Sequence, residues 1–310
     1  MVSERKLIGI AYICLALVSL AAATRLSKQL SETVGSGFFQ GQGKPLSRDA
    51  SFIDLRSEPA TQVIPADQAQ VMTAKAYIVG NVTTGRVYIQ HNSSVALPVA
   101  SMSKLVTAMV ALDTLPKDKK IVITPPEADV PPDGSGIAAG EAYTVSELMY
   151  PMLLDSSNVA AEALASSSNR AHFLELMSSY AWEIGMPTAF FADPSGVSLH
   201  NEASAKGLFA LAQYLYKSRQ DILAITRTAH LAVATTTDHG AHSFDSIHPF
   251  VKDPRFLGGK TGHTPEAMDT MMTIMQIDGQ KVALIVLGSQ DRAADTKLLI
   301  DKLESALAGI

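Results

Sequence analysis

A serine and a lysine spaced three residues apart, Ser101 and Lys104, begin an apolar segment that predicts a helix over 101–115. Residues at positions i and i+3 lie on one helix face, so the hydroxyl and the amine would be neighbours. A serine nucleophile needs a base to take its proton, and lysine can be that base when burial or a second cation lowers its pKa from about 10.4. The pair predicts nucleophilic catalysis, although Ser3 and Lys6 share the spacing without catalytic meaning.

Two further short motifs follow along the chain. Ser-Ser-Asn at 156–158 lies at the junction of two predicted helices, where a serine also commonly caps a helix. Lys-Thr-Gly at 260–262 follows two glycines, which let a ligand approach the backbone closely. The spacing of a phosphate-binding loop is missing there. Each motif alone is common, whereas the three in this order are far more specific.

The three motifs need elements that bring a helix, a helix junction and a strand together. Apolar periodicity and helix-end signals predict helices over 101–115, 146–154, 159–165, 171–184, 203–217 and 293–307. Turn signals predict two hairpins, from the strands 74–81 and 86–90 and from the strands 268–277 and 281–287. Strands at both ends of the domain, with helices between them, favour an α+β fold.

Length and composition exclude several classes of protein. The chain has 310 residues, 47% of them hydrophobic, which excludes a disordered chain and supplies enough apolar surface for a sizeable core. The 25 basic and 30 acidic residues give a net charge of -5 without a long basic run, so no nucleic-acid partner is expected. The single cysteine, Cys14, excludes an intrachain disulfide framework and a thiolate-rich metal site.

The N-terminus has the pattern of an export signal. Arg5 and Lys6 precede an uncharged run over 7–23 that ends in three alanines. As a helix this run would rise about 25 Å, less than the ~30 Å hydrocarbon core, so 1–24 is either a cleaved signal peptide or a signal-anchor. Residues 25–71, rich in glycine and proline, predict a flexible linker. We expect an exported protein, periplasmic or on the outer face of the cytoplasmic membrane, with any inner-membrane attachment through this segment.

The sequence also resembles a known family in blocks that extend beyond the three motifs. These are Ala-Ser-Met-Ser-Lys-Leu at 100–105, Met-Leu-Leu-Asp-Ser-Ser-Asn at 152–158, Asp-Pro-Ser-Gly at 193–196 and Gly-Lys-Thr-Gly-His-Thr at 259–264. They resemble the low-molecular-mass penicillin-binding proteins, the serine D-alanyl-D-alanine carboxypeptidases. The resemblance runs from about residue 75 to the C-terminus. It implies a mostly antiparallel sheet flanked by helices, an all-helical lobe with the active site in the cleft between them, and a catalytic domain over 72–310.

The resemblance implies catalytic roles for four side chains. Ser101 would attack the carbonyl carbon of the terminal D-Ala-D-Ala bond, and Lys104, its pKa lowered by burial and by a second lysine, would take the serine proton. Ser156 would help to pass a proton to the leaving amine, while Asn158 would hold Lys104 and the substrate amide. The backbone N–H groups of Ser101 and His263 would form the oxyanion hole.

The resemblance also assigns the substrate's C-terminal carboxylate to the Lys-Thr-Gly strand. Lys260 and Thr261 would bind it in a strand that continues through Gly262 and His263, and Arg292 would assist. Water would then hydrolyse the acyl-enzyme, so neither a metal nor another cofactor is expected. The implied partners are peptidoglycan stem peptides, with β-lactam antibiotics as covalent inhibitors.

Other functions of the same fold stay open. A D,D-endopeptidase that cleaves peptide cross-links would use the same residues, and a cell-wall-binding protein without turnover would keep them. A class A β-lactamase would need a glutamate four residues before an asparagine to activate the deacylating water. No glutamate between positions 158 and 260 has that spacing, so efficient β-lactamase activity is not expected.

Two further segments have alternative interpretations. The stretch 238–248 contains two aspartates and three histidines, which zinc accepts as ligands, but an exposed histidine-containing loop is the simpler prediction. The same stretch lacks the asparagines that the family favours there, which bears on substrate preference. The leucine face of the predicted helix 293–307 is expected to pack in the core rather than to anchor the chain in a membrane.

Overall fold

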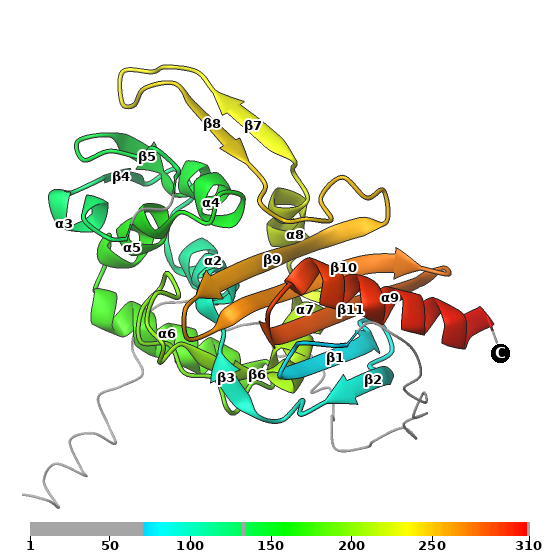
Figure 1. Cartoon of the computed structure of the whole chain (residues 1–310). Coiled ribbons are helices and arrows are strands. Elements are labelled where there is room, and N and C mark those ends of the chain that lie inside the picture. The colour runs from blue at the N-terminus through cyan, green and yellow to red at the C-terminus, as the bar shows by residue number, and fades with distance from the viewer. Residues whose placement is uncertain (1–70, 132–133, 309–310) are drawn as a thin grey trace, which may run out of the picture. The chain divides into compact units, whose positions relative to one another are not determined.

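A five-stranded sheet forms the centre of the fold. The computed structural model describes residues 71–131 and 134–308, so the predicted signal segment and the predicted linker up to residue 70 lie outside the described residues. The strands are β1 (Ala76–Asn81), β2 (Val87–His91), β9 (Phe256–Thr264), β10 (Met268–Ile277) and β11 (Gln280–Ser289). They lie in the order β2-β1-β11-β10-β9 with every neighbouring pair antiparallel (Figure 1). Segments distant in sequence therefore share one sheet, as predicted.

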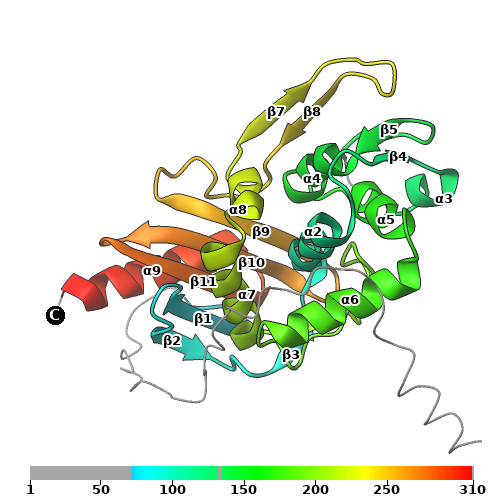
Figure 2. The same cartoon turned by 180° about the vertical axis from the view of Figure 1, so that it is seen from behind.

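Helices cover both faces of this sheet. The helix α9 (Arg292–Ala308) crosses one face, and α7 (Ala205–Ser218) and α8 (Gln220–Thr226) cover the other, as Figures 1 and 2 show from opposite sides. Strand β10 contributes side chains to the cores on both faces of the sheet, because side chains alternate along a strand. Met272 and Ile274 pack with α7 and α8, whereas Met275 and Ile277 pack with α9. Most of this methionine-rich strand is therefore buried.

The helix α9 contributes its leucine face to the core. Leu299 and Leu303 are buried against the sheet, and Leu307 packs on the same cluster. The prediction that this face packs in the core is confirmed. Within the ranges that the structure describes, no helix combines the length and the hydropathy needed to cross a membrane.

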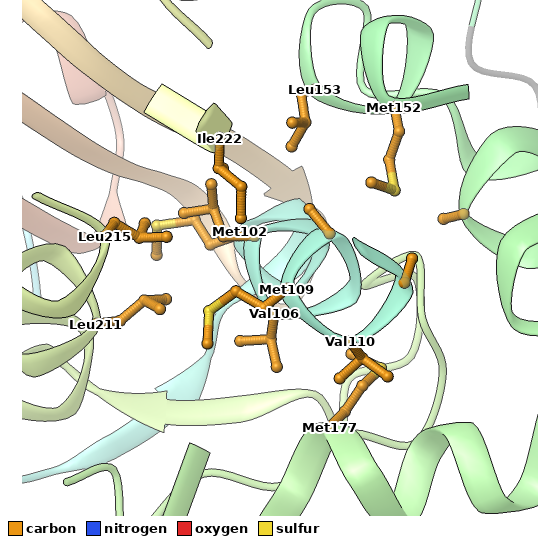
Figure 3. Close-up of a cluster of buried hydrophobic side chains, with 14 of the residues drawn as sticks. Met102, Val106, Met109, Val110, Met152, Leu153, Met177, Leu211, Leu215 and Ile222 are labelled. Atoms are coloured by element: carbon orange, nitrogen blue, oxygen red, sulfur yellow. The ribbon is translucent and has the colours of Figure 1, made fainter. Parts of the chain in front are cut away.

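A helical lobe lies beside the sheet. It contains α3 (Pro125–Ala128), α4 (Val145–Leu153), α5 (Asn158–Ser166), α6 (Arg170–Glu183) and the short strand pair β4 (Lys120–Val122) and β5 (Ala142–Thr144). The helix α2 (Ser103–Thr114) packs between this lobe and the helices on the sheet. Figure 3 shows Met102, Val106, Met109 and Val110 among side chains from α4, α6, α7 and α8. Apolar residues surround α2, as expected of a helix buried on all sides.

The start of α2 differs from the prediction of one helix over 101–115. A 3-10 turn, η1 (Ala100–Met102), comes first, and α2 begins at Ser103. Ala100 has a φ of +49°, in the left-handed region that few non-glycine residues adopt. Immediately before this turn, β3 (Ala96–Pro98) pairs with β6 (Glu202–Ser204). The other predicted helices and the two hairpins agree with the structure to within a few residues.

A further hairpin, β7 (His230–Val233) and β8 (His242–Asp245), occupies part of the segment predicted to be an exposed loop. That prediction is wrong, because His239 and His248 are buried. His239 stacks on Tyr143 of β5, and His242 Nε2 lies 2.9 Å from Glu141 Oε1. Contacts with Tyr143 and with Glu141, which precedes β5, thus give the rings of His239 and His242 partners far away in sequence. Among the described residues, no group of three or more His, Cys, Asp or Glu side chains is arranged to hold a metal ion.

His248 lies against the strand that carries the Lys-Thr-Gly motif. Its Nε2–H donates to Met272 O at 3.1 Å, and its Nδ1 accepts from Phe250 N at 3.3 Å, so both ring nitrogens are used by the neutral form. Burial lowers the pKa of His248 to about 3; the charges of Lys260 and Arg292 act in the same direction, and the bond to Met272 opposes them.

This buried neutral histidine should make the fold acid-sensitive. Because the pKa of His248 is lower in the folded chain than its ordinary 6.5, the unfolded chain binds the extra proton between about pH 6.5 and 3. Stability is therefore lost as the pH falls through that window. The free energy of unfolding, measured with urea, should therefore fall by about 2 kcal/mol less in His248→Gln than in the wild type between pH 6.5 and 5. His200→Gln, at an exposed position, should keep the wild-type slope. Equal slopes for His248→Gln and wild type would contradict this account.

Candidate active site

The candidate nucleophile and its neighbouring lysine lie at the junction of η1 and α2. Ser101 belongs to η1, and Lys104 lies in the first turn of α2 with its side chain completely buried. Lys104 Nζ lies 2.9 Å from Ser101 Oγ, so the neighbourhood predicted from the spacing is present. A buried amine in contact with a hydroxyl is the arrangement that a serine nucleophile with a lysine base requires.

Oxygens from two other segments contact the Lys104 amine. Nζ lies 2.8 Å from Asn158 Oδ1 and 2.5 Å from the backbone oxygen of Ser195. Ser101 Oγ also lies 3.4 Å from the Ser195 oxygen, so one carbonyl contacts both members of the pair. Asn158 is in contact with Lys104, as the resemblance implies.

The Ser195 carbonyl is a part of the site that sequence reasoning missed. The signal that could have found it is the Asp-Pro-Ser-Gly block at 193–196, which the resemblance singles out without giving it a role. Every residue carries a backbone acceptor, so no residue type marks the position of this one.

Ser156 lies in the turn between α4 and α5. It has a φ of +67°, a left-handed conformation that costs a non-glycine residue on the order of 1–3 kcal/mol and that is concentrated at functional sites. The cap of α5 is Ser157, whose Oγ accepts from Ala160 N at 3.1 Å, so the capping interpretation of Ser156 is wrong. Ser156 Oγ instead accepts a hydrogen bond from Lys260 Nζ at 2.8 Å.

Lys260 lies in the edge strand β9 and is almost fully buried. Burial holds the pKa of Lys260 well below its ordinary value; the positive charges of Lys104 and Arg292 lower it further, and the carboxylate of Asp155 acts against them. A lysine in this environment gives up its proton more readily near neutral pH than an exposed one.

The Lys-Thr-Gly strand packs directly on the turn that carries Ser101. A Cβ atom on Gly262 would lie 2.8 Å from Ser101 N and 2.9 Å from Ala100 Cβ, so the close approach requires glycine. On either side of it, Thr261 is buried and His263 is exposed. An edge strand presents a row of backbone groups that no neighbouring strand pairs, and β9 is such a strand beside η1.

Arg292 lies at the start of α9, and the fold brings it to the end of the motif. Its Nη1 donates to Gly262 O at 2.9 Å and to Asp269 Oδ1 at 3.2 Å. The same carboxylate oxygen lies 2.8 Å from His263 Nδ1. Asp269 therefore holds two of the predicted substrate-binding side chains, Arg292 and His263, next to Gly262.

The site thus contains two serine–lysine pairs, Ser101 with Lys104 and Ser156 with Lys260. Two cationic groups that are buried close together each make it harder to charge the other, which favours a neutral amine. Such an arrangement can activate a hydroxyl as a nucleophile and deliver a proton to a departing group. The remaining positive charge of the site attracts an anionic part of a substrate.

Three kinds of comparison relate the chain to known proteins. The family model for D-alanyl-D-alanine carboxypeptidase matches residues 62–291. A D-alanyl-D-alanine endopeptidase of Pseudomonas aeruginosa is 28% identical over 84% of this chain and 88% of that protein. A D-alanyl-D-alanine carboxypeptidase of Mycobacterium tuberculosis is 25% identical over 76% of this chain and 80% of that protein. Penicillin-binding protein D2 from Listeria monocytogenes, solved in the ampicillin-bound form, has a TM-score of 0.65 and 26% identity, covering 76% of this chain and 99% of that one.

Proposed function

Because the chain belongs to the D-alanyl-D-alanine carboxypeptidase family of serine peptidases, we propose that it removes the terminal D-alanine of peptidoglycan stem peptides through an acyl-enzyme at Ser101. The observation that carries this proposal is the 2.9 Å contact between the buried Lys104 amine and Ser101 Oγ. The substrate is a cell-wall polymer, so the protein acts outside the cytoplasmic membrane. β-Lactam antibiotics acylate the same serine.

In the first step, Lys104 as a neutral amine takes the hydroxyl proton of Ser101 while Oγ bonds to the carbonyl carbon of the penultimate D-alanine. The carbonyl oxygen becomes an oxyanion that accepts hydrogen bonds from the backbone N–H groups of Ser101 and His263. A donor of this kind commonly contributes about 3 kcal/mol to the transition state. The close approach at Gly262 supports this assignment, because it brings β9 against Ser101 N.

In the second step the C–N bond breaks and the leaving amine takes a proton from Ser156 Oγ. The charged amine of Lys260 then gives a proton to Ser156. The 2.8 Å contact and the lowered pKa of Lys260 support this relay. Lys260, Thr261 and Arg292 hold the carboxylate next to the scissile nitrogen, and Asn158 holds the substrate amide. The proton gained by Lys104 restores Lys260 by way of the solvent. Water then hydrolyses the ester and returns the proton of Ser101.

Cleavage of cross-links by the same site is the second candidate activity. The relative from Pseudomonas aeruginosa is named an endopeptidase, and the one from Mycobacterium tuberculosis a carboxypeptidase. Both reactions share the acyl-enzyme and differ only in the leaving group, which is a single D-alanine or a second stem peptide. The residues described above serve either leaving group.

We expect the full-length chain to release D-alanine from a peptide ending in D-Ala-D-Ala or to split a cross-linked peptide dimer, and to lose that activity with benzylpenicillin. Mass spectrometry of the two digests decides between the activities. Cleavage of the dimer alone would replace the carboxypeptidase assignment by the endopeptidase one. Intact substrates and no penicilloyl adduct would contradict the proposal, and rapid destruction of the penicillin would identify a β-lactamase instead.

A further inference from the structure

The loop between α6 and β6 is folded around a single buried carboxylate, that of Asp193. The donors to it are Ser195 N (2.9 Å), Ser195 Oγ (2.9 Å), Gly196 N (2.5 Å), Val197 N (3.3 Å) and Ser198 N (2.6 Å). Hydrogen bonds to a charged acceptor are about twice as strong as neutral ones. A carboxylate engaged by this many donors shapes the backbone around it, and the Ser195 carbonyl belongs to that backbone.

Asn201 closes this loop onto α2. Its side chain is fully buried, and its Oδ1 accepts from Ala192 N at 2.9 Å and from Asp193 N at 3.2 Å. Its Nδ2 donates to Asp193 O at 2.8 Å and to Ser103 Oγ at 3.0 Å. Ser103 lies inside the Ser-x-x-Lys motif, so Asn201 ties the loop to the helical turn that carries the reaction.

Two further contacts press the loop onto the same turn. A Cβ atom on Gly196, whose φ is +83°, would lie 2.0 Å from Ala100 O. Thr107 Oγ1 donates to Pro194 O at 2.6 Å farther along α2. The loop therefore has no room to shift relative to η1 and α2, and the position of the Ser195 carbonyl is fixed.

The Ser195 carbonyl has a specific effect on the neutral amine of Lys104. That amine has two N–H groups and one lone pair, and Asn158 Oδ1 and Ser195 O, at 2.8 and 2.5 Å, can only accept. When these oxygens take the two N–H groups, the lone pair is left facing Ser101 Oγ at 2.9 Å. The amine is then oriented to receive the serine proton before a substrate arrives.

We propose that Asp193 and Asn201 are positioning residues that hold the Ser195 carbonyl where it directs the Lys104 lone pair at the Ser101 proton. This inference rests on the proposed acyl-enzyme function. Neither side chain touches the reacting atoms, so replacing it should slow the acylation step while the affinity for the β-lactam before acylation stays nearly constant. A purely structural role would instead change stability, or affect affinity and rate together.

The test uses the full-length chain and a fluorescent penicillin, with adduct formation followed at rising concentrations to separate the dissociation constant K from the acylation rate k2. In Asp193→Asn and Asn201→Asp we expect k2 to fall about 100-fold, the effect of a misplaced catalytic group, and K to stay within threefold. Ser103→Ala removes the acceptor of one Asn201 hydrogen bond and the hydroxyl that donates to Ala100 O at 2.9 Å, and it leaves the Asp193 carboxylate in place. This variant should fold even if the other two are too unstable to measure, and it should lower k2 about tenfold.

Asp113→Asn is the matched control. It breaks the ion pair with Arg219 at the far end of α2, so it should lower the melting temperature and leave k2 unchanged. A k2 within threefold of wild type in the loop variants would overturn the positioning role. The role would also be overturned if Asp113→Asn lost as much k2 as loop variants of the same stability. A wild-type chain that forms no adduct would overturn the proposed function, and the positioning role with it.

Discussion

Ser101→Ala is expected to form no penicilloyl adduct and to lose peptidase activity by on the order of 10⁴-fold or more. The reason is that, in the proposed mechanism, the hydroxyl in contact with Lys104 Nζ is the group that bonds to the substrate. Removing one partly exposed oxygen leaves the packing of η1 intact, so the fold should be retained. Intact-mass spectrometry after incubation with benzylpenicillin, together with D-alanine release, measures both losses.

Ser305→Ala provides the control for this result. Its hydroxyl lies on the exposed side of α9 and bonds only within that helix, to Asp301 O, so the variant should acylate like wild type. A penicilloyl group found on Ser101→Ala would show that another residue is the nucleophile, and peptide mapping would identify it.

Lys104→Met is expected to slow acylation by penicillin about 10³-fold, within the usual range for loss of a general base. Methionine keeps much of the side-chain length but cannot take the Ser101 proton. It also leaves Asn158 Oδ1 and Ser195 O without the amine that contacts them. Burial, which lowers the pKa of Lys260 most, is unchanged in this variant, so that pKa should stay below its ordinary value. The rate of adduct formation with a fluorescent penicillin measures the main effect.

Lys297→Met, at an exposed position of α9, is the matched control and should react at the wild-type rate. The adduct on Lys104→Met should still form at Ser101, only slowly. A rate within tenfold of wild type would mean that another group takes the proton, and Lys260 would be the next residue to replace.

Most of the framework could be predicted because its signals are local. The hairpin of β10 and β11 turns at Asp278-Gly279, and both residues have positive φ, as a tight two-residue turn requires. The Ser-x-x-Lys spacing gave the contact between Ser101 and Lys104 because helical geometry alone brings positions i and i+3 together. Such features depend on a few consecutive residues.

The features that were missed depend on contacts between distant segments. The strands β7 and β8 are joined by residues 234–241, a connection without a two-residue turn signal. His239 is buried because it stacks on Tyr143, nearly a hundred positions away in the chain. Likewise, the φ of Ser156 and its contact with Lys260 arise only when α4, α5 and β9 meet. No window of sequence contains these partners.

The methionines around α2 have a consequence for how the protein responds to oxidants. Met102, Met109, Met152 and Met177 are fully buried in the core that supports η1 and α2. Oxidation to the sulfoxide makes a methionine polar, and a polar group without partners is costly in such a core. While the fold is closed, the sulfurs are shielded from peroxide. A molecule whose core unfolds and is oxidised cannot pack that core again. Oxidative damage would therefore accumulate only in molecules that have unfolded, and it would inactivate them.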